Sequence, residues 1–373
     1  MVECIECHPE YLKLEKFVRI LLKILNLSFI PGKYLRGYRK IAIPVFALYC
    51  LTSVAFTTIY FKRDLMKLIC SAMIFMAYFQ LLTKSLSALI HSNELETLLQ
   101  FIQKIHEVHQ IDLVTNSARR HLKRIIRIIK IVLRILFPVN FTAGAGIILY
   151  FVYIDSMLLA MPGVFPKLNG TLFYQHIHQV SLIQISTLMV LLPDTALLTI
   201  GFYFFAVLNI FSDIIQDLDK VDSSKKTEFL IYIHKIHCDI LNKFKLFGQV
   251  FFFTFTIQIA TSVVFVLSVF FLMYNEKSVA FIPLLLVVFG EFGTLCIFGE
   301  FIYSKTERFS TELYLTKWYE CSLEEQKMFL MIMHISQKPF GIKAAGMYDI
   351  NLVMFIDVVK AGVSFCALLY TLA

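Results

Sequence analysis

The sequence predicts an all-α membrane protein with seven spanning helices, a cytoplasmic N-terminus, an extracellular C-terminus and a cytoplasmic helical anchor. Of the 373 residues, 58% are hydrophobic and only 17% are charged, whereas soluble domains are about 45–50% apolar. The charged residues fall in blocks between long apolar runs, a pattern typical of loops that alternate with membrane-spanning helices. The distribution of Lys and Arg among these blocks then predicts the orientation.

Seven nearly uncharged runs are long enough to cross about 30 Å of hydrocarbon as helices. They cover residues 41–61, 68–90 (interrupted by Lys84), 135–154, 188–212, 246–274, 280–304 and 347–371. No internal repeat separates them into units, so residues 1–373 are expected to form a single membrane domain.

Lys and Arg residues are concentrated in alternate connections between these runs. The segment before the first run, the second connection counted with its helix ends (and so with Lys84), and the fourth and sixth connections hold 29 of the 35 Lys and Arg residues, whereas the other three connections hold five. Because cytoplasmic loops carry the excess of positive charge, we expect a cytoplasmic N-terminus and, after seven crossings, an external C-terminus. This orientation is the reverse of that of G-protein-coupled receptors.

A short helix is predicted on the cytoplasmic side at residues 321–339. Ser322 and Glu325 form a capping-box pattern, and Pro339 ends the helix. The helix is too short to span a bilayer and too apolar to lie bare in water. It either packs against its own chain or forms a contact between subunits beneath the membrane. Its apolar residues are Phe329, Leu330, Ile332, Met333 and Ile335.

The last apolar segment, residues 345–373, carries charges inside a predicted spanning helix. Asp357 and Lys360 stand three residues apart and therefore share one helical face. Charged residues within spanning helices usually face protein or a water-filled path. The pattern fits a final helix that lines an aqueous pore, or a structural ion pair against another helix.

Motifs for catalysis and for metal or nucleic-acid binding are missing from the sequence, and its one match to a cofactor pattern, the haem-attachment pattern C-x-x-C-H at Cys4 to His8, is short and comes with no axial-ligand domain. It contains no nucleophile elbow, no phosphate-binding glycine loop and no paired catalytic carboxylates, so we expect no enzyme activity. The histidine pairs lack the further ligands of a metal site, and no basic motif with interleaved aromatic residues suggests nucleic acid. We therefore expect no cofactor, no metal and no nucleic-acid partner. Of the N-x-S/T sequons, Asn169 is the one predicted to face the outside and to accept a glycan.

Two stretches near the C-terminus carry a recognisable pattern. The first, FGEFIYSKTERFSTELYLTKWYE, contains Phe298-Gly299-Glu300, Ser304, Tyr314 and Trp318-Tyr319. The second, KPFGIKAAGMYDINLVMFIDVVKAGVSFCALLYTL, contains Lys338-Pro339, Ala345-Gly346, Phe355, Lys360, Ser364 and Phe365. In these features, which cover about the last fifth of the chain, the sequence resembles the insect odorant receptors. The frame in which gustatory receptors carry T-Y and Q-F reads Ser364-Phe365 and Thr371-Leu372 here, which favours the odorant branch.

The resemblance implies the odorant-binding subunit of a heteromeric, ligand-gated, non-selective cation channel. Such a subunit forms a heterotetramer with the odorant receptor co-receptor, binds a small volatile ligand, and lies in the plasma membrane of olfactory sensory neurons. The co-receptor itself has a long insertion in its second cytoplasmic loop, which this chain lacks. The alternatives are a seven-helix receptor of gustatory type, a G-protein-coupled receptor or a small-molecule transporter. The loop charges oppose a G-protein-coupled receptor, and the lack of repeats opposes a transporter.

The resemblance also implies where ligand and gate residues lie. The odorant pocket of the family is in the outer half of the membrane, among the second, third, fourth and sixth helices. With the predicted topology those outer halves contain Cys70, Met73, Ile74, Ala143, Gly146, Tyr150, Ala196, Ile200, Phe289 and Phe292. Small residues there open space and aromatic ones line it, although ordinary packing is the alternative for each.

The last helix is expected to line the pore with Asp357 and Lys360. Leu368 and Leu372 match the hydrophobic gate positions of the family. An apolar ring of this kind can close a pore by excluding water.

Overall fold

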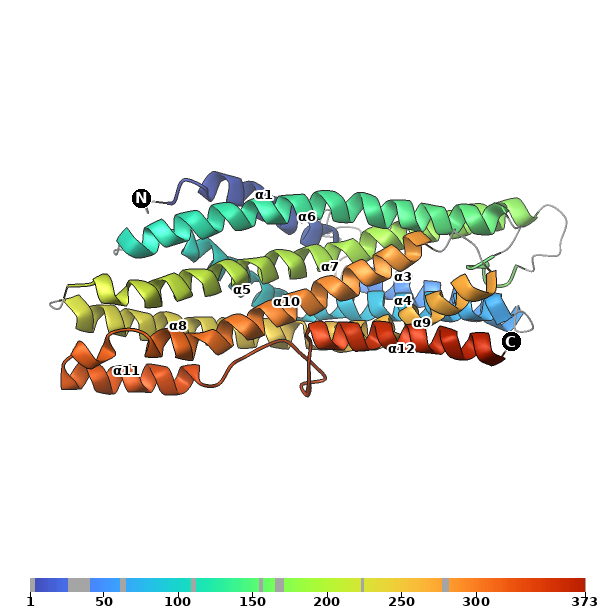
Figure 1. The fold of residues 1–373 in the computed structure, drawn as a ribbon. Coiled ribbons are helices and arrows are strands. Elements are labelled where there is room, and N and C mark those ends of the chain that lie inside the picture. Colours follow the sequence, from blue (N-terminus) through green and yellow to red (C-terminus); the bar gives the residue numbers. More distant parts are fainter. Residues whose placement is uncertain are drawn as a thin grey trace.

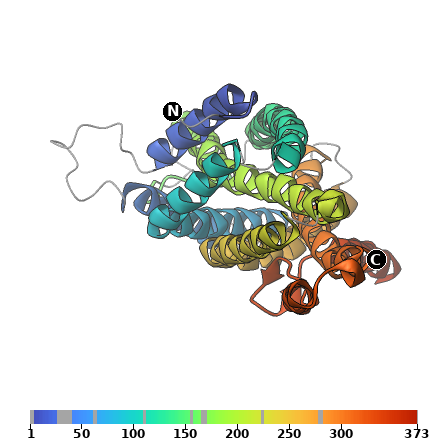
Figure 2. The same ribbon diagram turned by 90° about the vertical axis from the view of Figure 1, so that its left-hand side faces the viewer.

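The chain forms an elongated bundle of helices that run roughly along one common direction (Figure 1). The computed structural model describes residues 4–25, 41–60, 65–108, 112–153, 157–164, 171–222, 225–276 and 282–372. The two termini lie at opposite ends of the bundle (Figure 1). Seen along the bundle, α1 and α6 lie on one side and α11 and α12 lie on the other, while α10 crosses between the two sides (Figure 2).

Helices make up nearly all of the described chain. In chain order the α-helices are α1 (His8–Leu25), α3 (Ala42–Tyr60), α4 (Leu65–Ile90), α5 (Ser92–Ile105), α6 (Asp112–Tyr153), α7 (Thr171–Gln216), α8 (Lys226–Val250), α9 (Phe252–Glu276), α10 (Ile282–Tyr314), α11 (Leu323–Ser336) and α12 (Leu352–Leu372). Two short 3₁₀ helices, η2 (Asp217–Lys220) and η5 (Trp318–Glu320), and a hairpin of β1 (Lys343–Ala344) with β2 (Tyr348–Asp349) complete the described elements.

Six helices within the described ranges are long and apolar enough to cross a membrane: α3, α4, α6, α7, α9 and α10. They coincide with the first six of the seven apolar runs in the sequence. The helix α12, which occupies most of the seventh run, is not among the six. The all-helical class is therefore confirmed, whereas the number of spans and the orientation of the termini stay predictions.

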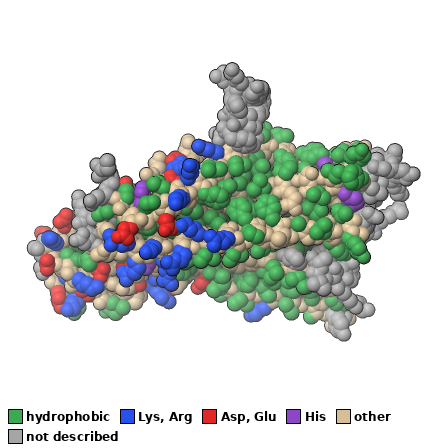
Figure 3. Space-filling model, turned by 90° about the horizontal axis from the view of Figure 1, so that it is seen from above, with side chains coloured by type: hydrophobic (Ala, Val, Ile, Leu, Met, Phe, Trp, Pro, Cys, Tyr) green, Lys and Arg blue, Asp and Glu red, His purple; other side chains and the backbone are tan. Residues whose placement is uncertain are grey.

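Several helices are much longer than a bilayer requires. The helices α6 and α7 have 42 and 46 residues, or roughly 63 and 69 Å at 1.5 Å per residue, against about 30 Å of hydrocarbon. Their surplus length lies at the end of the bundle where charged side chains gather, while apolar side chains cover the rest of the face seen in Figure 3. The molecule thus has an apolar half and a charged half.

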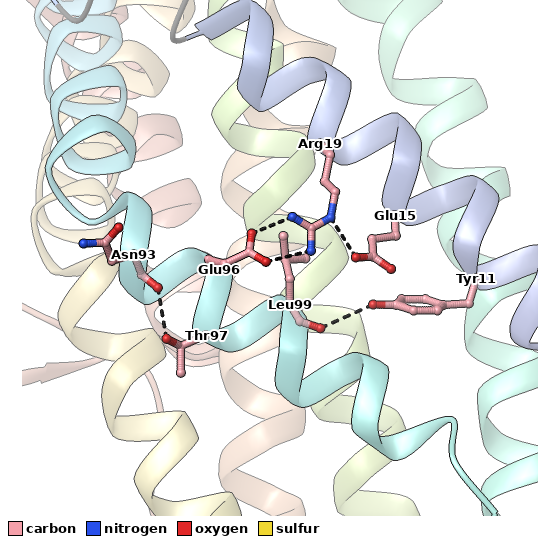
Figure 4. Close-up of polar contacts among 7 residues, drawn as sticks. All are labelled: Tyr11, Glu15, Arg19, Asn93, Glu96, Thr97 and Leu99. Carbon is pink, nitrogen blue, oxygen red and sulfur yellow. Dashed lines mark hydrogen bonds and ion pairs between the residues drawn. The ribbon is translucent and has the colours of Figure 1, made fainter. Parts of the chain in front are cut away.

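In the charged half, α1 is joined to α5 by a network of polar contacts (Figure 4). The two outer nitrogens of the Arg19 guanidinium bind the carboxylate of Glu96 at 2.5 and 2.9 Å, and its Nε binds Glu15 Oε1 at 2.7 Å. The hydroxyl of Tyr11 donates to the carbonyl of Leu99 at 3.3 Å. Bidentate pairing of this kind fixes orientation as well as distance, so α1 has a defined position and orientation against α5.

The predicted capping box is present at the start of α11. The Ser322 hydroxyl accepts a hydrogen bond from the backbone N–H of Glu325, and the Glu325 carboxylate accepts one from the backbone N–H of Ser322. The helix ends at Ser336, shortly before Pro339. Phe329 is fully buried and stacks on Trp318, whereas Leu330 and Met331 on the other face are more than half exposed. One face of α11 therefore packs on its own chain, and the other has no cover within the described part of one subunit.

The hairpin β1–β2 leads into α12 and rests on α10 at a glycine. A Cβ placed on Gly299 would stand 2.0 Å from the carbonyl oxygen of Ile350, so only glycine lets the two backbones approach this closely. The Asn351 side chain then caps α12 by accepting from the N–H of Met354 at 2.9 Å. The Phe298-Gly299-Glu300 motif thus packs against the residues just before the last helix. That helix begins at Leu352 because residues 343–349 form the hairpin.

Candidate functional site

A cavity of about 230 Å³ lies in the apolar half of the bundle, between α4, α6, α7 and α10, with α9 completing its wall. We call it the outer cavity. Its walls are mostly hydrocarbon, with representative contributions from Ile74 of α4, Ala143 of α6, Ile183 of α7, Phe265 of α9 and Val288 of α10. A largely apolar, concave space with few polar groups is typical of sites for small ligands.

One polar feature of the outer cavity is a hydroxyl pair. The Ser186 hydroxyl of α7 lies 3.1 Å from the hydroxyl of Tyr78 of α4, and both residues are buried. Both also line the cavity. The pair joins α4 to α7 and presents oxygen atoms to an otherwise apolar ligand.

The segment 157–164, between α6 and α7, contributes Leu158 to the wall of the outer cavity. Its backbone is held by side chains of α3 and α7. The amide of Ala160 donates to Thr57 Oγ1 at 2.8 Å, its carbonyl accepts from Ser53 at 2.7 Å, and the amide of Leu158 donates to Gln179 Oε1 at 3.1 Å. Because side chains satisfy these backbone groups, a non-helical segment can lie buried within the bundle.

The residues predicted to bind the ligand separate into two groups in the structure. Cys70, Met73, Ile74 and Ala143 line the outer cavity. The other six do not line it: Gly146, Tyr150, Ala196, Ile200, Phe289 and Phe292.

Helix geometry accounts for the six that lie elsewhere. On α6 the cavity-lining face is centred on Asn140, Gly144, Ile147 and Phe151, with Ala143 at its edge, and Gly146 and Tyr150 lie on the flank beyond Ala143. Ala196 and Ile200 are buried in the packed core of α7, further toward the charged half. Phe289 and Phe292 face α12, where both rings contact Phe355.

The contact between α10 and α12 connects the cavity wall to the last helix. The ring of Phe292 lies 5.4 Å from that of Phe355, and the ring of Phe289 lies 6.0 Å from it. A Cβ on Gly293 would meet Phe355 at 3.4 Å, so the two helices are close-packed here. The opposite face of α10 supplies Leu284, Val287, Val288 and Glu291 to the outer cavity. The helix α10 therefore contacts both the outer cavity and α12.

A buried ion pair, which sequence reasoning missed, lies beside the cavity. The ammonium of Lys84 in α4 lies 2.8 and 2.9 Å from the two carboxylate oxygens of Asp194 in α7. The side chain of Lys84 is fully buried. Glu291 of α10 is near enough to interact electrostatically with both. We call Lys84, Asp194 and Glu291 the charge cluster; ionisable groups at membrane depth mark functional positions by default.

The predicted pore residues lie on an exposed helix. Asp357 and Lys360 are both exposed on α12, and no ion pair joins them in the described part of the chain. Leu368 is 54% exposed, whereas the side chain of Leu372 and the predicted glycosylation site Asn169 lie outside the described residues. The described residues contain no cluster of three or more His, Cys, Asp or Glu side chains suited to a metal ion.

Six helices that are long and apolar enough to cross a membrane, and a largely apolar cavity between them, are typical of a membrane protein that binds a small ligand. A family model described as the seven-transmembrane odorant receptor matches residues 64–363. The chain therefore belongs to the insect odorant receptor family, whose members are ligand-gated cation channels.

Solved structures agree with this assignment at the level of the fold. The insect olfactory receptor OR5 from Machilis hrabei in complex with eugenol is similar with a TM-score of 0.78 and 15% identity, covering 98% of this chain and 100% of that one. The structure of the same receptor described without eugenol gives 0.77 and 14%, covering 99% and 100%. A search of curated proteins found no match.

Proposed function

We propose that this chain is the odorant-binding subunit of a heteromeric cation channel, formed with the odorant receptor co-receptor in the plasma membrane of olfactory sensory neurons. The outer cavity binds a small volatile ligand. The observation that carries the proposal is that one helix, α10, lines the cavity with one face and packs against α12 with another.

The proposed topology has seven spans, with α12 as the seventh. The charged half, which contains α1, α5, α8 and α11, lies in the cytoplasm, and the C-terminus lies outside. Two observations support it: the termini are at opposite ends of the bundle (Figure 1), and 28 of the 35 Lys and Arg residues, without the buried Lys84, belong to the segments assigned to the cytoplasm.

In the proposed assembly the last helices of four subunits surround the pore. The helix α12 leaves Val353, Ile356 and Val363 about half exposed in the single chain, and neighbouring copies of this helix would cover them. Leu368 and Leu372 supply an apolar constriction near the outer end, and Asp357 and Lys360 face the water-filled path or a neighbouring helix. The exposed face of α11 supplies a contact between subunits below the membrane.

The proposed gating step is a displacement of α10. A ligand that fills the outer cavity pushes on Val287 and Val288, and the opposite face of α10 moves Phe292 against Phe355. Because packed interfaces switch between discrete arrangements, this contact biases α12 toward an open position.

The test is odorant-evoked current in cells that express this chain with the co-receptor, this chain alone, or the co-receptor alone. The proposal expects a panel of volatile compounds to evoke current only from the combination. Phe292→Ala should lower the maximal current more than it changes the half-maximal concentration, because the ring touches α12 and not the cavity. Equal responses from the co-receptor alone would refute the proposed function.

A further inference from the structure

A second cavity, of about 250 Å³, adjoins the outer cavity on the side of the charged half. We call it the inner cavity. Asn140, Val287 and Glu291 line both cavities, so the two spaces meet at these residues. Asp194 and Gln258 line the inner cavity but not the outer one. Its polar lining therefore comes from four helices: α6, α7, α9 and α10.

The polar groups around the inner cavity offer several hydrogen-bond acceptors. Gln258 is 5% exposed, and its side-chain oxygen has no hydrogen-bond partner. The amide nitrogen of Asn140 donates to the carbonyl of Leu136 at 3.0 Å, which leaves its amide oxygen free to accept. The carboxylates of Asp194 and Glu291 add further acceptor oxygens. A buried acceptor without a donor is costly, so this lining favours a ligand that donates several hydrogen bonds.

Acidic residues outnumber basic ones at this place. The charge cluster contains two acids and one base, and Lys84 is already paired with Asp194. Within the described part of the chain, no donor lies within hydrogen-bonding distance of the Glu291 carboxylate. A carboxyl group at membrane depth stays neutral unless a cation pairs with it, and the two cavities leave space for a cation beside Glu291.

We propose that the joined cavities bind a small amine as its ammonium ion. The inference rests on the proposed function, because it names the ligand class of the proposed odorant site. The ammonium lies in the inner cavity, where it donates hydrogen bonds to Glu291, Gln258 and Asn140. The apolar skeleton of the amine extends into the outer cavity. An alcohol of the same skeleton has one donor and no charge, and it leaves most of these acceptors unpaired.

The test compares phenethylamine with phenethyl alcohol, which share a skeleton, on cells that express this chain with the co-receptor. The amine should be the more potent agonist by roughly tenfold to a hundredfold, the range for a hydrogen bond to a charged group. Glu291→Gln should remove most of that advantage while the response to the alcohol stays. Glu307→Gln, on the same helix but exposed and outside both cavities, is the matched control and should leave both responses unchanged.

The outcomes separate the ligand class from the function itself. Equal potency of amine and alcohol on the parent channel overturns the inference, and this comparison needs no variant to fold. An equal loss of both responses in Glu291→Gln channels that reach the surface also overturns it, because the acid would then be structural. Currents evoked by other volatile compounds but by no amine overturn the ligand class and leave the proposed function standing. A channel that no volatile compound opens refutes the proposed function instead.

Discussion

Replacing Lys84 by Met removes the base of the charge cluster and leaves Asp194 and Glu291 as two acids at membrane depth. The pair that is lost is short, at 2.8 Å, and its side chains are 0% and 11% exposed. Removing one partner of a buried ion pair costs about 3–5 kcal/mol. Asp194→Asn should cost less than Lys84→Met, because Glu291 remains near enough to act as the counter-ion of Lys84.

The assay is chemical denaturation of the tagged protein in detergent, with surface expression measured in parallel. The double variant Lys84→Met with Asp194→Leu should recover most of the stability lost in Lys84→Met alone, because it removes both charges of the pair. A double-mutant cycle through the two single variants then gives the interaction free energy between residues 84 and 194. Equal losses in the two single variants, together with a double variant whose loss is their sum, would refute the reasoning.

Three further changes test other parts of the molecule. Arg19→Met should destabilise the charged half by about 1 kcal/mol, near the upper limit for partly exposed pairs. Arg19 holds the pKa of Glu96 below its ordinary value, so the ion pair stabilises the fold above about pH 4.3 and stabilises it less as the pH falls further. Unfolding of the parent and of Arg19→Met at pH 7 and pH 4 checks this, and an equal loss of stability at both pH values would contradict it. Gly299→Ala should destabilise the protein by about 1–3 kcal/mol through overpacking and should reduce the current. The control Gly248→Ala, which has no atom within 4 Å of the added Cβ, should do neither. Similar stability and current in both variants would contradict the packing described between α10 and the start of α12. Leu368→Ser should raise the current without odorant, because a polar residue makes the closed constriction easier to wet; an unchanged resting current would argue against a gate there.

The sequence did not predict which of the candidate ligand residues line the outer cavity. Apolar runs and loop charges place a residue along the membrane normal, and Ala143 and Gly146 are at nearly the same depth. The face that a helix turns inward depends on its neighbours, which one sequence does not reveal. In the structure Ala143 lies at the edge of the cavity-lining face of α6, whereas Gly146, about 60° further from the centre of that face at 100° per residue, does not line the cavity, and a Cβ added to it would meet no atom within 4 Å.

The charge cluster was hidden by its separation along the chain. Lys84 appeared as an interruption of the second apolar run, and its partner Asp194 is 110 residues away. A signal was present nonetheless: Lys84, Asp194 and Glu291 each interrupt a long apolar stretch, and buried charges need partners. Pairing such residues across helices would have pointed to this place.

The most direct test of the central claim, that odorants act in the outer cavity, compares Ala143→Leu with Gly146→Leu. Both variants enlarge a small residue on α6, but only the first projects into the cavity. With the co-receptor present and surface expression matched, Ala143→Leu should raise the half-maximal odorant concentration by roughly tenfold or more. Gly146→Leu should respond as the parent does. An unchanged dose response in Ala143→Leu, or an equal shift in both variants, would contradict the assignment of this cavity as the odorant site.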